Sequence, residues 1–488
     1  MRTGVTRREM LRHAGIGAAA LLLASCQPKV VERIVTETVV VEKEVEKEVI
    51  VKEAVEVQKE VTRVVEKQVE KVVEIGRDIF KGDLSIWHGW GNTGGGGLAV
   101  MDQVEAFERL YPNVKMNNVF DANQDKWMAA IAGGNPPDLL LQNANQLPPM
   151  AQRGALMALD PFVERDSVDM SQYFDFAIDH CSWRGRLYAM THHPDVRVFY
   201  RNLEVMEEAG LPLDQEPKDW DEVYEWGKQM SKQEGGRYSR FGFVASWTSN
   251  SWADQYMQAN GVELISEDGR DAVFATELAE EAMRFVVKCV DDICGGRNNV
   301  EEFVQVNATP EGTGPYRMFP YNRMGMVHFG NWLLYPVSVL KPDMKIGLGT
   351  IPGGYSNSNE RFVFGGGTMF AIPTGATHWE LAWEWLKWMG GEEGQYLVQA
   401  RTADIAGRID SALDPRILEQ HIYRKEMVEL FVEANAPSYL KSPIAAQWGP
   451  EMTRLQDRVL LKEAPIPQLL AEAQSEIQKA LDEFWATA

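Results

Sequence analysis

The chain has 488 residues, of which 45% are hydrophobic and 25% are charged, so it is long enough for two or three globular domains with sizeable cores. Its formal net charge of -22 argues against a nucleic-acid partner, because binding to phosphate groups needs clustered Lys and Arg side chains. Apart from this exclusion, the composition is that of an ordinary globular protein.

Residues 1–26 have the pattern of a signal peptide. Arg residues precede an apolar run at 14–23, which is too short to remain in a bilayer as a spanning helix. Residues 6–12, TRREMLR, resemble a twin-arginine export signal; an ordinary basic start is the alternative, so the export route stays open between Tat and Sec. Residues 23–26, LASC, resemble a bacterial lipobox, which implies a lipidated Cys26. Acyl chains on Cys26 would anchor the protein to the outer face of the cytoplasmic membrane.

Residues 27–80 are dominated by Val, Glu and Lys. The stretch from 30 to 77 has no aromatic residue, so it cannot build a globular core of its own. Val recurs every four residues at 61, 65, 69 and 73, a spacing that spirals around a helix and also falls on one face of a strand. We expect a charged, partly helical stalk. A dedicated coiled coil is less favoured, because apolar a and d positions are not sustained.

The remaining cysteines give no sign of a metal site. Cys181, Cys289 and Cys294 have neither a CxxC pair nor histidines at ligand spacing. Cys289 and Cys294 could form a local disulfide in an exported protein, or they could be two buried thiols, and the spacing does not decide between the two.

A globular body begins near residue 81, where strand and helix patterns start to alternate. The expected elements are a strand at 84–87, a Gly-rich loop at 88–97, a helix at 98–111, a strand at 114–120, a helix around 126–132, a turn at 133–137, a strand at 138–141, and C-terminal helices at 379–389, 419–434, 451–461 and 469–485. This alternation predicts an α/β fold with a largely parallel sheet.

Several segments of the body resemble one protein family when they are taken in order. They are AAIAGGNPPDLLL at 129–141, GALMALD at 154–160, GRLYAM at 185–190, MGMVHFGNW at 324–332 and GGGTMFAIP at 365–373. Together they resemble the extracytoplasmic sugar-binding proteins of ABC importers, the family of maltose-binding protein, over residues 84–488. The sequence departs from the family at Met190, where Pro is usual, and at Arg201, where Tyr is common.

The resemblance implies a two-lobe periplasmic-binding-protein fold of the class II type, with a hinge and an interlobe cleft. Lobe 1 would comprise residues 81–194 and 350–408, and lobe 2 residues 195–349 and 409–488. A carbohydrate, more precisely an oligosaccharide, would bind in the cleft and pass to the membrane subunits of an ABC permease. No cofactor, metal ion or nucleic acid is implied.

Loops at the carboxyl ends of strands supply the first candidate ligand contacts, because such loops converge on one crevice. Asn and Gln can donate and accept hydrogen bonds to sugar hydroxyls, and aromatic rings can stack on sugar faces. The candidates from these loops are Trp87, His88, Trp90, Asn92, Asn143, Asn145 and Gln146. The glycine run at 94–97 could offer backbone N–H groups to an anion, but a flexible turn is favoured because no nucleotide-loop motif follows.

The resemblance adds further candidates. Trp332, beside Asn331, matches a stacking position of the family, and Trp448 falls near another, with core packing as the alternative for both. Asp195 matches a hinge-proximal carboxylate that accepts hydrogen bonds from sugar hydroxyls. His192 and His193 are adjacent, so at most one, His193, is expected to face the cleft. Trp247 and Trp252 are weaker candidates.

An enzyme is not expected, because the sequence has neither a GxSxG nor an HExxH motif. A lipid-anchored glycoside hydrolase stays possible, since paired carboxylates occur by chance in an acidic chain. The more serious alternative is the same fold binding a peptide, a polyol or a sugar phosphate. An anchored structural or adhesive protein would explain the stalk but not the ordered motifs of the body.

Overall fold

The computed structural model of the protein describes residues 77, 79–92, 94–246, 252–307, 315–420, 423–433 and 442–487. The expected signal peptide, Cys26 and almost all of the expected stalk lie outside the described residues.

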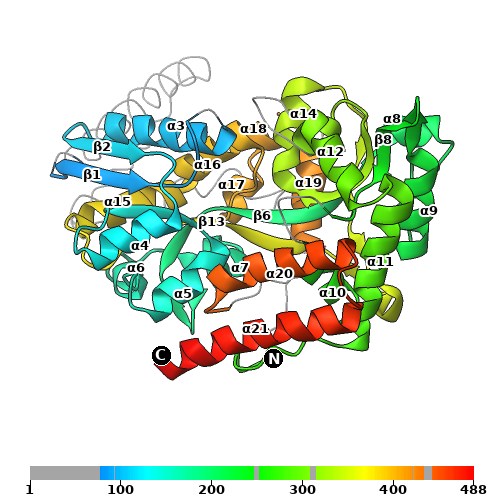
Figure 1. The fold of residues 1–488 in the computed structure, drawn as a ribbon. Coiled ribbons are helices and arrows are strands. Elements are labelled where there is room, and N and C mark those ends of the chain that lie inside the picture. The colour runs from blue at the N-terminus through cyan, green and yellow to red at the C-terminus, as the bar shows by residue number, and fades with distance from the viewer. Residues whose placement is uncertain are drawn as a thin grey trace, which may run out of the picture. The chain divides into compact units, whose positions relative to one another are not determined.

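One mixed sheet runs through the body, in the strand order β2-β1-β3-β13-β6-β9-β8-β7, with β10 paired to β6 (Figure 1). Its strands are β1 (Gly82–Trp87), β2 (Val114–Val119), β3 (Leu139–Asn143), β6 (Ala189–Asn202), β7 (Lys232–Glu234), β8 (Arg237–Phe243), β9 (Met324–Gly330), β10 (Ile346–Gly347) and β13 (Phe364–Ala371). Helices alternate with these strands, so the predicted α/β class is confirmed.

The expectation of a largely parallel sheet is wrong for the middle of the sheet. β1 is parallel to β2 and β3, and β8 is parallel to β9. In contrast, β13 is antiparallel to β3 and β6, and β6 is antiparallel to β9. The reason is the path of the chain: it leaves one half of the body along β6 and returns along β13 in the opposite direction, and neighbouring strands of opposite direction must pair antiparallel.

Two separate apolar clusters divide the body into two lobes. The first cluster, lobe 1, includes Leu84 and Ile86 of β1 and Trp385 of α15, all of which are fully buried. Its helices and its small hairpin are α3 (Gly95–Leu110), α4 (Gln124–Ala132), α5 (Leu147–Gln152), α6 (Asp160–Asp166), α7 (Asp175–His180), β4 (Ser182–Trp183), β5 (Arg186–Leu187), α15 (Trp379–Gly390) and α16 (Glu392–Thr402).

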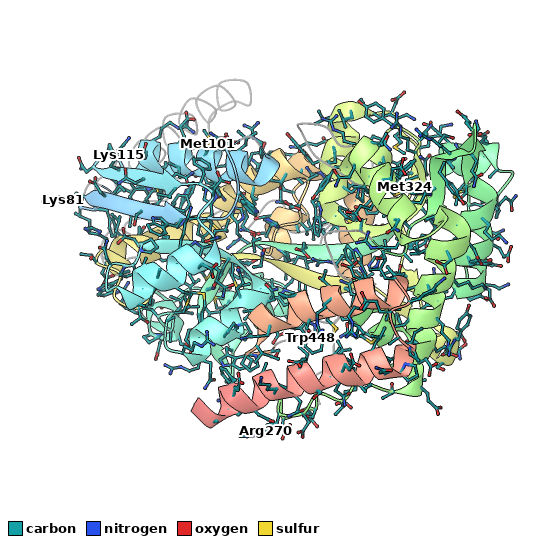
Figure 2. All side chains as sticks on the ribbon, in the orientation of Figure 1. Lys81, Met101, Lys115, Arg270, Met324 and Trp448 are labelled. Carbon is teal, nitrogen blue, oxygen red and sulfur yellow. The ribbon has the colours of Figure 1, made fainter. Side chains whose placement is uncertain are left out.

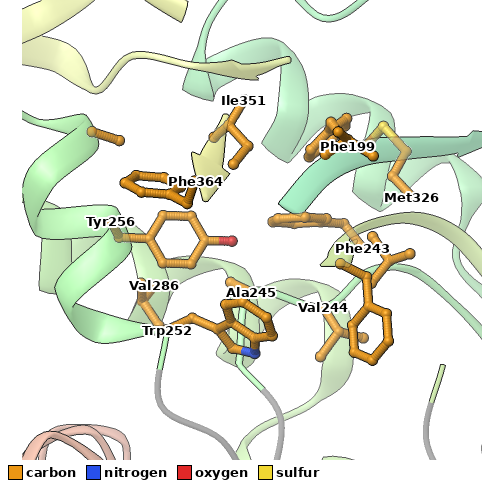
Figure 3. Packing of buried hydrophobic residues seen from close by; sticks show 14 of the residues in the cluster. Phe199, Phe243, Val244, Ala245, Trp252, Tyr256, Val286, Met326, Ile351 and Phe364 are labelled. Atoms are coloured by element: carbon orange, nitrogen blue, oxygen red, sulfur yellow. The ribbon is translucent and has the colours of Figure 1, made fainter. Parts of the chain in front are cut away.

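The second cluster, lobe 2, surrounds aromatic side chains such as Tyr256, Phe243 and Phe364 (Figure 3). Its helices are α8 (Leu203–Glu208), α9 (Trp220–Met230), α10 (Ala253–Ala259), α11 (Glu277–Cys294), α12 (Arg297–Val306), α13 (Pro315–Met318), α14 (Leu334–Leu340), α19 (Tyr423–Glu433), α20 (Ala445–Leu460) and α21 (Ile466–Thr487). The hairpin β11 (Ile351–Pro352) and β12 (Arg361–Phe362) also belongs here, and α17 (Ile409–Ala412) and α18 (Pro415–Leu418) connect α16 to α19.

The strands β6 and β13 join the two lobes (Figure 1). Along the chain, membership changes from the first cluster to the second between Met190 and Val196, and back between Phe364 and Met369. The lobe borders expected from the sequence, at 194/195, 349/350 and 408/409, stay a prediction. The clusters put the return crossing within β13, later than residue 350.

Helix boundaries differ from the sequence expectation where Gly and Pro were taken as limits. The helix expected from residue 98 begins at Gly95, inside the glycine run, and the helix expected from residue 451 begins at Ala445 and carries Pro450 within it.

All 14 residues of β6 are buried, because this strand is covered on both faces where it joins the lobes. Period-two patterning is therefore hidden in β6.

None of the three cysteines in the described part of the chain forms a disulfide. Cys289 and Cys294 are both buried on α11, and Cys181 is buried in lobe 1. Burial raises the pKa of the Cys289 and Cys294 thiols, so both stay protonated at neutral pH. Of the two alternatives left open by the sequence, buried thiols are the one found.

His328 on β9 should make the stability of the protein depend on pH. It is fully buried beside Trp252, and burial lowers its pKa from 6.5 to about 3, with a further contribution from Arg197. An unfolded chain would bind a proton at His328 below pH 6.5, so the free energy of unfolding should fall by up to about 1.4 kcal/mol per pH unit as the pH drops below that value.

The variant His328→Leu should remove this dependence. Urea unfolding of both proteins between about pH 7 and pH 4.5 measures the difference in their free energies of unfolding. As the pH falls, the free energy of unfolding of the wild type should decrease more than that of the variant. If the free energies of unfolding of the two proteins change equally with pH, His328 is not the cause of the dependence.

Candidate functional site

A cavity of about 950 Å³ lies between the two lobes, and we call it the first cavity. Lobe 1 contributes Trp90, Asn143 and His193, and lobe 2 contributes Trp332 and Tyr335. The complete lining is Trp90, Gly94, Gly95, Gly96, Asn143, Ala144, Asn145, His193, Asp195, Arg197, Tyr316, Arg317, Trp332, Tyr335, Pro336, Val339, Leu340, Gly367, Thr368, Thr402 and Asp404. Aromatic rings and hydrogen-bonding groups thus meet at one place from both lobes.

A second cavity of about 800 Å³ adjoins the first and shares Asn145, Arg197 and Trp332 with it. The rest of its lining comes mainly from α10 and α20: Trp252, Asp254, Gln255, Ser442, Ala445, Trp448, Gly449, Pro450, Met452, Thr453, Arg454, Asp457 and Arg458. Figure 2 shows Trp448 on α20. The two cavities together form one extended hollow region in the body, and we call it the cavity region.

Arg197 and Trp332 lie where the two cavities meet. The Arg197 guanidinium carbon is 5.1 Å from the centre of the Trp332 ring, and Arg197 forms an ion pair with Asp195, which is two residues away on β6. Both partners are almost fully buried, at 6% and 8% exposure. The ion pair with Asp195 and the contact with the Trp332 ring together hold the guanidinium at the junction of the cavities.

Asp404 is the second buried carboxylate of the region. Asn331 Nδ2 donates a hydrogen bond of 2.9 Å to Asp404 Oδ1, and His193 Nε2 lies 3.6 Å from Asp404 Oδ2. Burial raises the pKa of Asp404, and the nearby His193 opposes that shift. The strand β6 carries His193, and the segment after α16 carries Asp404, so this contact joins two parts of the lining of the first cavity.

Seven of the residues expected from the sequence line the cavities. Trp90, Asn143, Asn145, His193, Asp195 and Trp332 line the first cavity, and Trp448 lines the second. Their contact with a ligand stays a prediction. Of the two adjacent histidines, His193 lines the first cavity, whereas His192 is fully buried with its Nε2 2.9 Å from Gln103 Oε1.

Five expected residues line neither cavity. The His88 ring is fully buried and bonds to Asn118 Oδ1 at 2.8 Å, and the half-buried Trp87 packs on the lobe 1 core. Asn92 is exposed on the loop before α3. Gln146 caps its own short turn by accepting from the Asn143 backbone N–H. Asn331 is fully buried; its Oδ1 accepts a hydrogen bond from the Val196 N–H, and its Nδ2 donates one to Asp404 Oδ1.

These corrections share one cause: adjacency to a cleft residue in the sequence does not make a side chain point into the cleft. Trp252, one of the weaker candidates, lines the second cavity, whereas Trp247 lies outside the described residues. Gly94–Gly96 line the first cavity, but the favoured flexible turn is wrong for most of the run, because Gly94 caps α3 and Gly95 and Gly96 belong to its first turn.

The sequence reading missed several cavity residues. Arg197 could have been found, since residues 193, 195 and 197 recur with the period of a strand and all line the first cavity. Tyr316, Tyr335, Asp254 and Asp404 carry no local motif, because segments distant in sequence bring them to the region.

Within the residues that the structure describes, no group of three or more His, Cys, Asp or Glu side chains could hold a metal ion. The same residues contain no helix that is long and apolar enough to span a membrane.

The sequence of the chain matches a known protein family. Residues 90–396 match the bacterial extracellular solute-binding proteins. The chain is 23% identical over 315 residues to the arabinooligosaccharide-binding protein of Bacillus subtilis, a match that covers 60% of this chain and 66% of the relative. It is 26% identical over 188 residues to the sn-glycerol-3-phosphate-binding periplasmic protein of Brucella abortus, covering 37% of this chain and 42% of the relative. The chain thus spans less than two thirds of the length of either relative.

The fold is also that of solved binding proteins. The structure of CpMnBP1 with mannobiose bound matches with a TM-score of 0.71 and 21% identity, over 81% of this chain and 99% of the other. The likeness supports the two-lobe architecture, and the family match extends over more than half of the chain. The protein therefore belongs to the family of bacterial extracellular solute-binding proteins.

Proposed function

We propose that the protein is the extracytoplasmic receptor of an ABC importer and that it binds a carbohydrate, more precisely an oligosaccharide, between its lobes. One observation carries the proposal: aromatic rings and hydrogen-bonding side chains from both lobes line two adjoining cavities. Sugars present apolar faces and polar edges, so they need both kinds of group. The sugar-binding names of the first relative and of the solved neighbour point the same way.

The mechanism is hinge closure about β6 and β13. A ligand that touches Trp90 in lobe 1 and Trp332 in lobe 2 gains contacts when the lobes approach, and this gain favours the closed state. A ligand that touched one lobe alone could not shift the equilibrium. The permease would recognise the closed form and receive the sugar. No step of this mechanism needs a catalytic group.

A thermal-shift screen tests the function. Neutral oligosaccharides, monosaccharides, polyols, sn-glycerol 3-phosphate and peptides would each be added to the purified protein. A ligand at 100 times its Kd should raise the free energy of unfolding by about 2.7 kcal/mol. We expect stabilisation by at least one neutral oligosaccharide without release of reducing sugar. Stabilisation by peptides alone, or hydrolysis of the sugar, would overturn the proposal.

A phosphorylated solute is the second candidate, because one group of relatives binds sn-glycerol 3-phosphate. The same screen contains that compound. A rise in melting temperature with sn-glycerol 3-phosphate, and no rise with any neutral sugar, would favour this candidate.

The export signal and the lipobox support a place on the outer face of the cytoplasmic membrane, with the Val/Glu/Lys-rich segment as a stalk. Cys26→Ser should leave the body folded and release the protein from the membrane fraction, because the acyl chains on Cys26 are the proposed anchor. Fractionation after a salt wash measures this, with Cys181→Ser as a control that keeps the lipobox. Retention of the Cys26 variant at the wild-type level would contradict the anchor.

A further inference from the structure

The second cavity contains buried polar atoms that lack a partner. Among the residues that the structure describes, Gln255 Oε1, Trp252 Nε1 and Asn145 Oδ1 make no hydrogen bond. Gln255 and Trp252 are 6% and 5% exposed, and all three residues line the cavity. Buried polar groups in native proteins are nearly always hydrogen-bonded, and these three atoms are shielded from solvent just behind the cavity surface, so the wall has hydrogen-bonding capacity that the protein itself does not use.

Asp254 adds acceptors at the same wall. Its Oδ2 accepts a hydrogen bond of 3.3 Å from Trp448 Nε1, and its Oδ1 accepts one of 3.0 Å from the Gln255 N–H. A carboxylate has about four acceptor positions, so these two bonds leave capacity for more. Burial raises the pKa of Asp254, which means that a donor from a ligand would relieve an incompletely solvated carboxylate.

The cations of this cavity are already engaged. Arg454 pairs with Glu451 at 2.7 Å, and Arg458 pairs with Glu472 at 2.8 Å and with Glu463 at 3.0 Å. Arg197 pairs with Asp195. An anionic ligand would therefore meet the Asp254 carboxylate without a free positive partner in the described lining, whereas hydroxyl groups could donate to the remaining acceptor positions of Asp254.

From these contacts we infer that the second cavity is a subsite for an uncharged end of the ligand that is rich in hydroxyl groups, and that Asp254 and Gln255 determine this specificity. The inference rests on the proposed function and deepens it. Because the first cavity holds Trp90 and the second holds Asp254, a ligand that serves both must be longer than one sugar unit. The substrate class is then a neutral oligosaccharide, and the second cavity disfavours a phosphate group.

Titration calorimetry of two variants tests the subsite. The probes are mannotriose, maltotriose and arabinotriose, the monosaccharides mannose, glucose and arabinose, and sn-glycerol 3-phosphate. Asp254→Asn and Gln255→Leu should each weaken trisaccharide binding by roughly 10-fold, as expected for one lost hydrogen bond to a charged or buried group. Monosaccharide binding, where present, should change less than about twofold, since one unit does not reach both cavities.

Gln258→Leu is the matched control, because Gln258 lies on the same helix and lines neither cavity. It should bind like the wild type, and thermal melting would show that each variant is folded. If Asp254→Asn does not fold, Gln255→Leu carries the test. Unchanged trisaccharide binding in the folded variants would overturn the subsite and leave the proposed function intact. Binding of sn-glycerol 3-phosphate in place of every sugar would overturn both.

An independent observation concerns four side chains, which we call the Trp–Arg ladder. The guanidinium carbon of Arg184 lies 5.6 Å from the Trp183 ring centre and 4.8 Å from that of Trp485, and Arg270 lies 4.8 Å from Trp485. Trp183 packs on the lobe 1 cluster, and Trp485 of α21 packs on the lobe 2 cluster. The ladder therefore joins the lobes at residues that line neither cavity.

Both tryptophans are fixed within their own lobes. Trp183 Nε1 donates to Gln152 Oε1 at 2.9 Å, and Trp485 Nε1 donates to the Gly269 carbonyl at 3.0 Å. Arg184 is exposed and stands between them. We propose that the Trp–Arg ladder is a latch that favours the conformation in which both lobes line the cavities, because its contacts require the hairpin β4–β5 to meet α21.

Arg184→Gln tests the latch, with Arg186→Gln on the same hairpin as the control. Exposed cation–π contacts contribute about 0.5–1 kcal/mol, so Arg184→Gln should weaken binding of the best trisaccharide by roughly two- to fivefold, through faster dissociation. The control should be unchanged. Equal affinity and equal dissociation rate in Arg184→Gln and the wild type would overturn the latch, while the subsite would be unaffected.

Discussion

Trp332→Ala is expected to weaken oligosaccharide binding by roughly 10- to 100-fold while leaving the protein folded. The side chain is half-buried on the short turn after β9 and lines both cavities, so it is the ring that a spanning ligand meets at the junction. Losing one aromatic platform from a sugar face costs on the order of 1–3 kcal/mol. The substitution also removes the ring that the Arg197 guanidinium contacts, 5.1 Å from its centre, while the ion pair with Asp195 remains.

Calorimetry of the variant measures the affinity, and urea unfolding measures the stability. Trp388→Ala is the matched control: Trp388 is also half-buried in an aromatic cluster, with Trp385 at 5.3 Å, but it lines neither cavity. The control should bind normally. If Trp332→Ala instead unfolds readily and its folded fraction binds like the wild type, Trp332 is a core residue.

Asn331→Leu is expected to do the reverse: it should destabilise the fold by about 2–4 kcal/mol with a smaller effect on affinity. Asn331 Oδ1 accepts from the Val196 N–H at 2.8 Å, and its Nδ2 donates to Asp404 at 2.9 Å. The residue is fully buried, so leucine would leave a backbone N–H and a buried carboxylate without these partners. Each such loss costs about 1–3 kcal/mol, and more for a charged group.

Urea unfolding gives the free energy, and calorimetry on the folded variant gives the affinity. We therefore expect Trp332→Ala to lower mainly the affinity for the sugar, and Asn331→Leu to lower mainly the free energy of unfolding. A stable Asn331→Leu protein that has lost sugar binding would restore the sequence expectation that Asn331 contacts the ligand.

The sequence was sufficient for the α/β class, and seven of its twelve candidate ligand contacts line the cavities. Strand ends are readable from local pattern, which is why Asn143 and Asn145 were found, and the family motif led to Trp332. His88 shows the limit of this reasoning. It follows β1 directly, but its ring turns inward to Asn118 of β2, and no local pattern reports that partner.

Contacts between distant segments were out of reach for the same reason. Asp254 on α10 and Trp448 on α20 are joined by a hydrogen bond across 194 positions of sequence, and the second cavity exists because those helices pack together. The antiparallel middle of the sheet likewise depends on where the chain crosses between lobes, which residue alternation cannot show in a strand that is buried along its whole length.

Small-angle scattering of the protein, with and without a saturating amount of the trisaccharide that binds most tightly in calorimetry, is the most direct test of the claim that both lobes grip one carbohydrate. The radius of gyration should decrease on saturation, since a ligand that contacts Trp90 and Trp332 together draws the lobes towards each other. An unchanged radius of gyration at confirmed saturation, from an unliganded protein whose scattering shows separated lobes, would contradict the account.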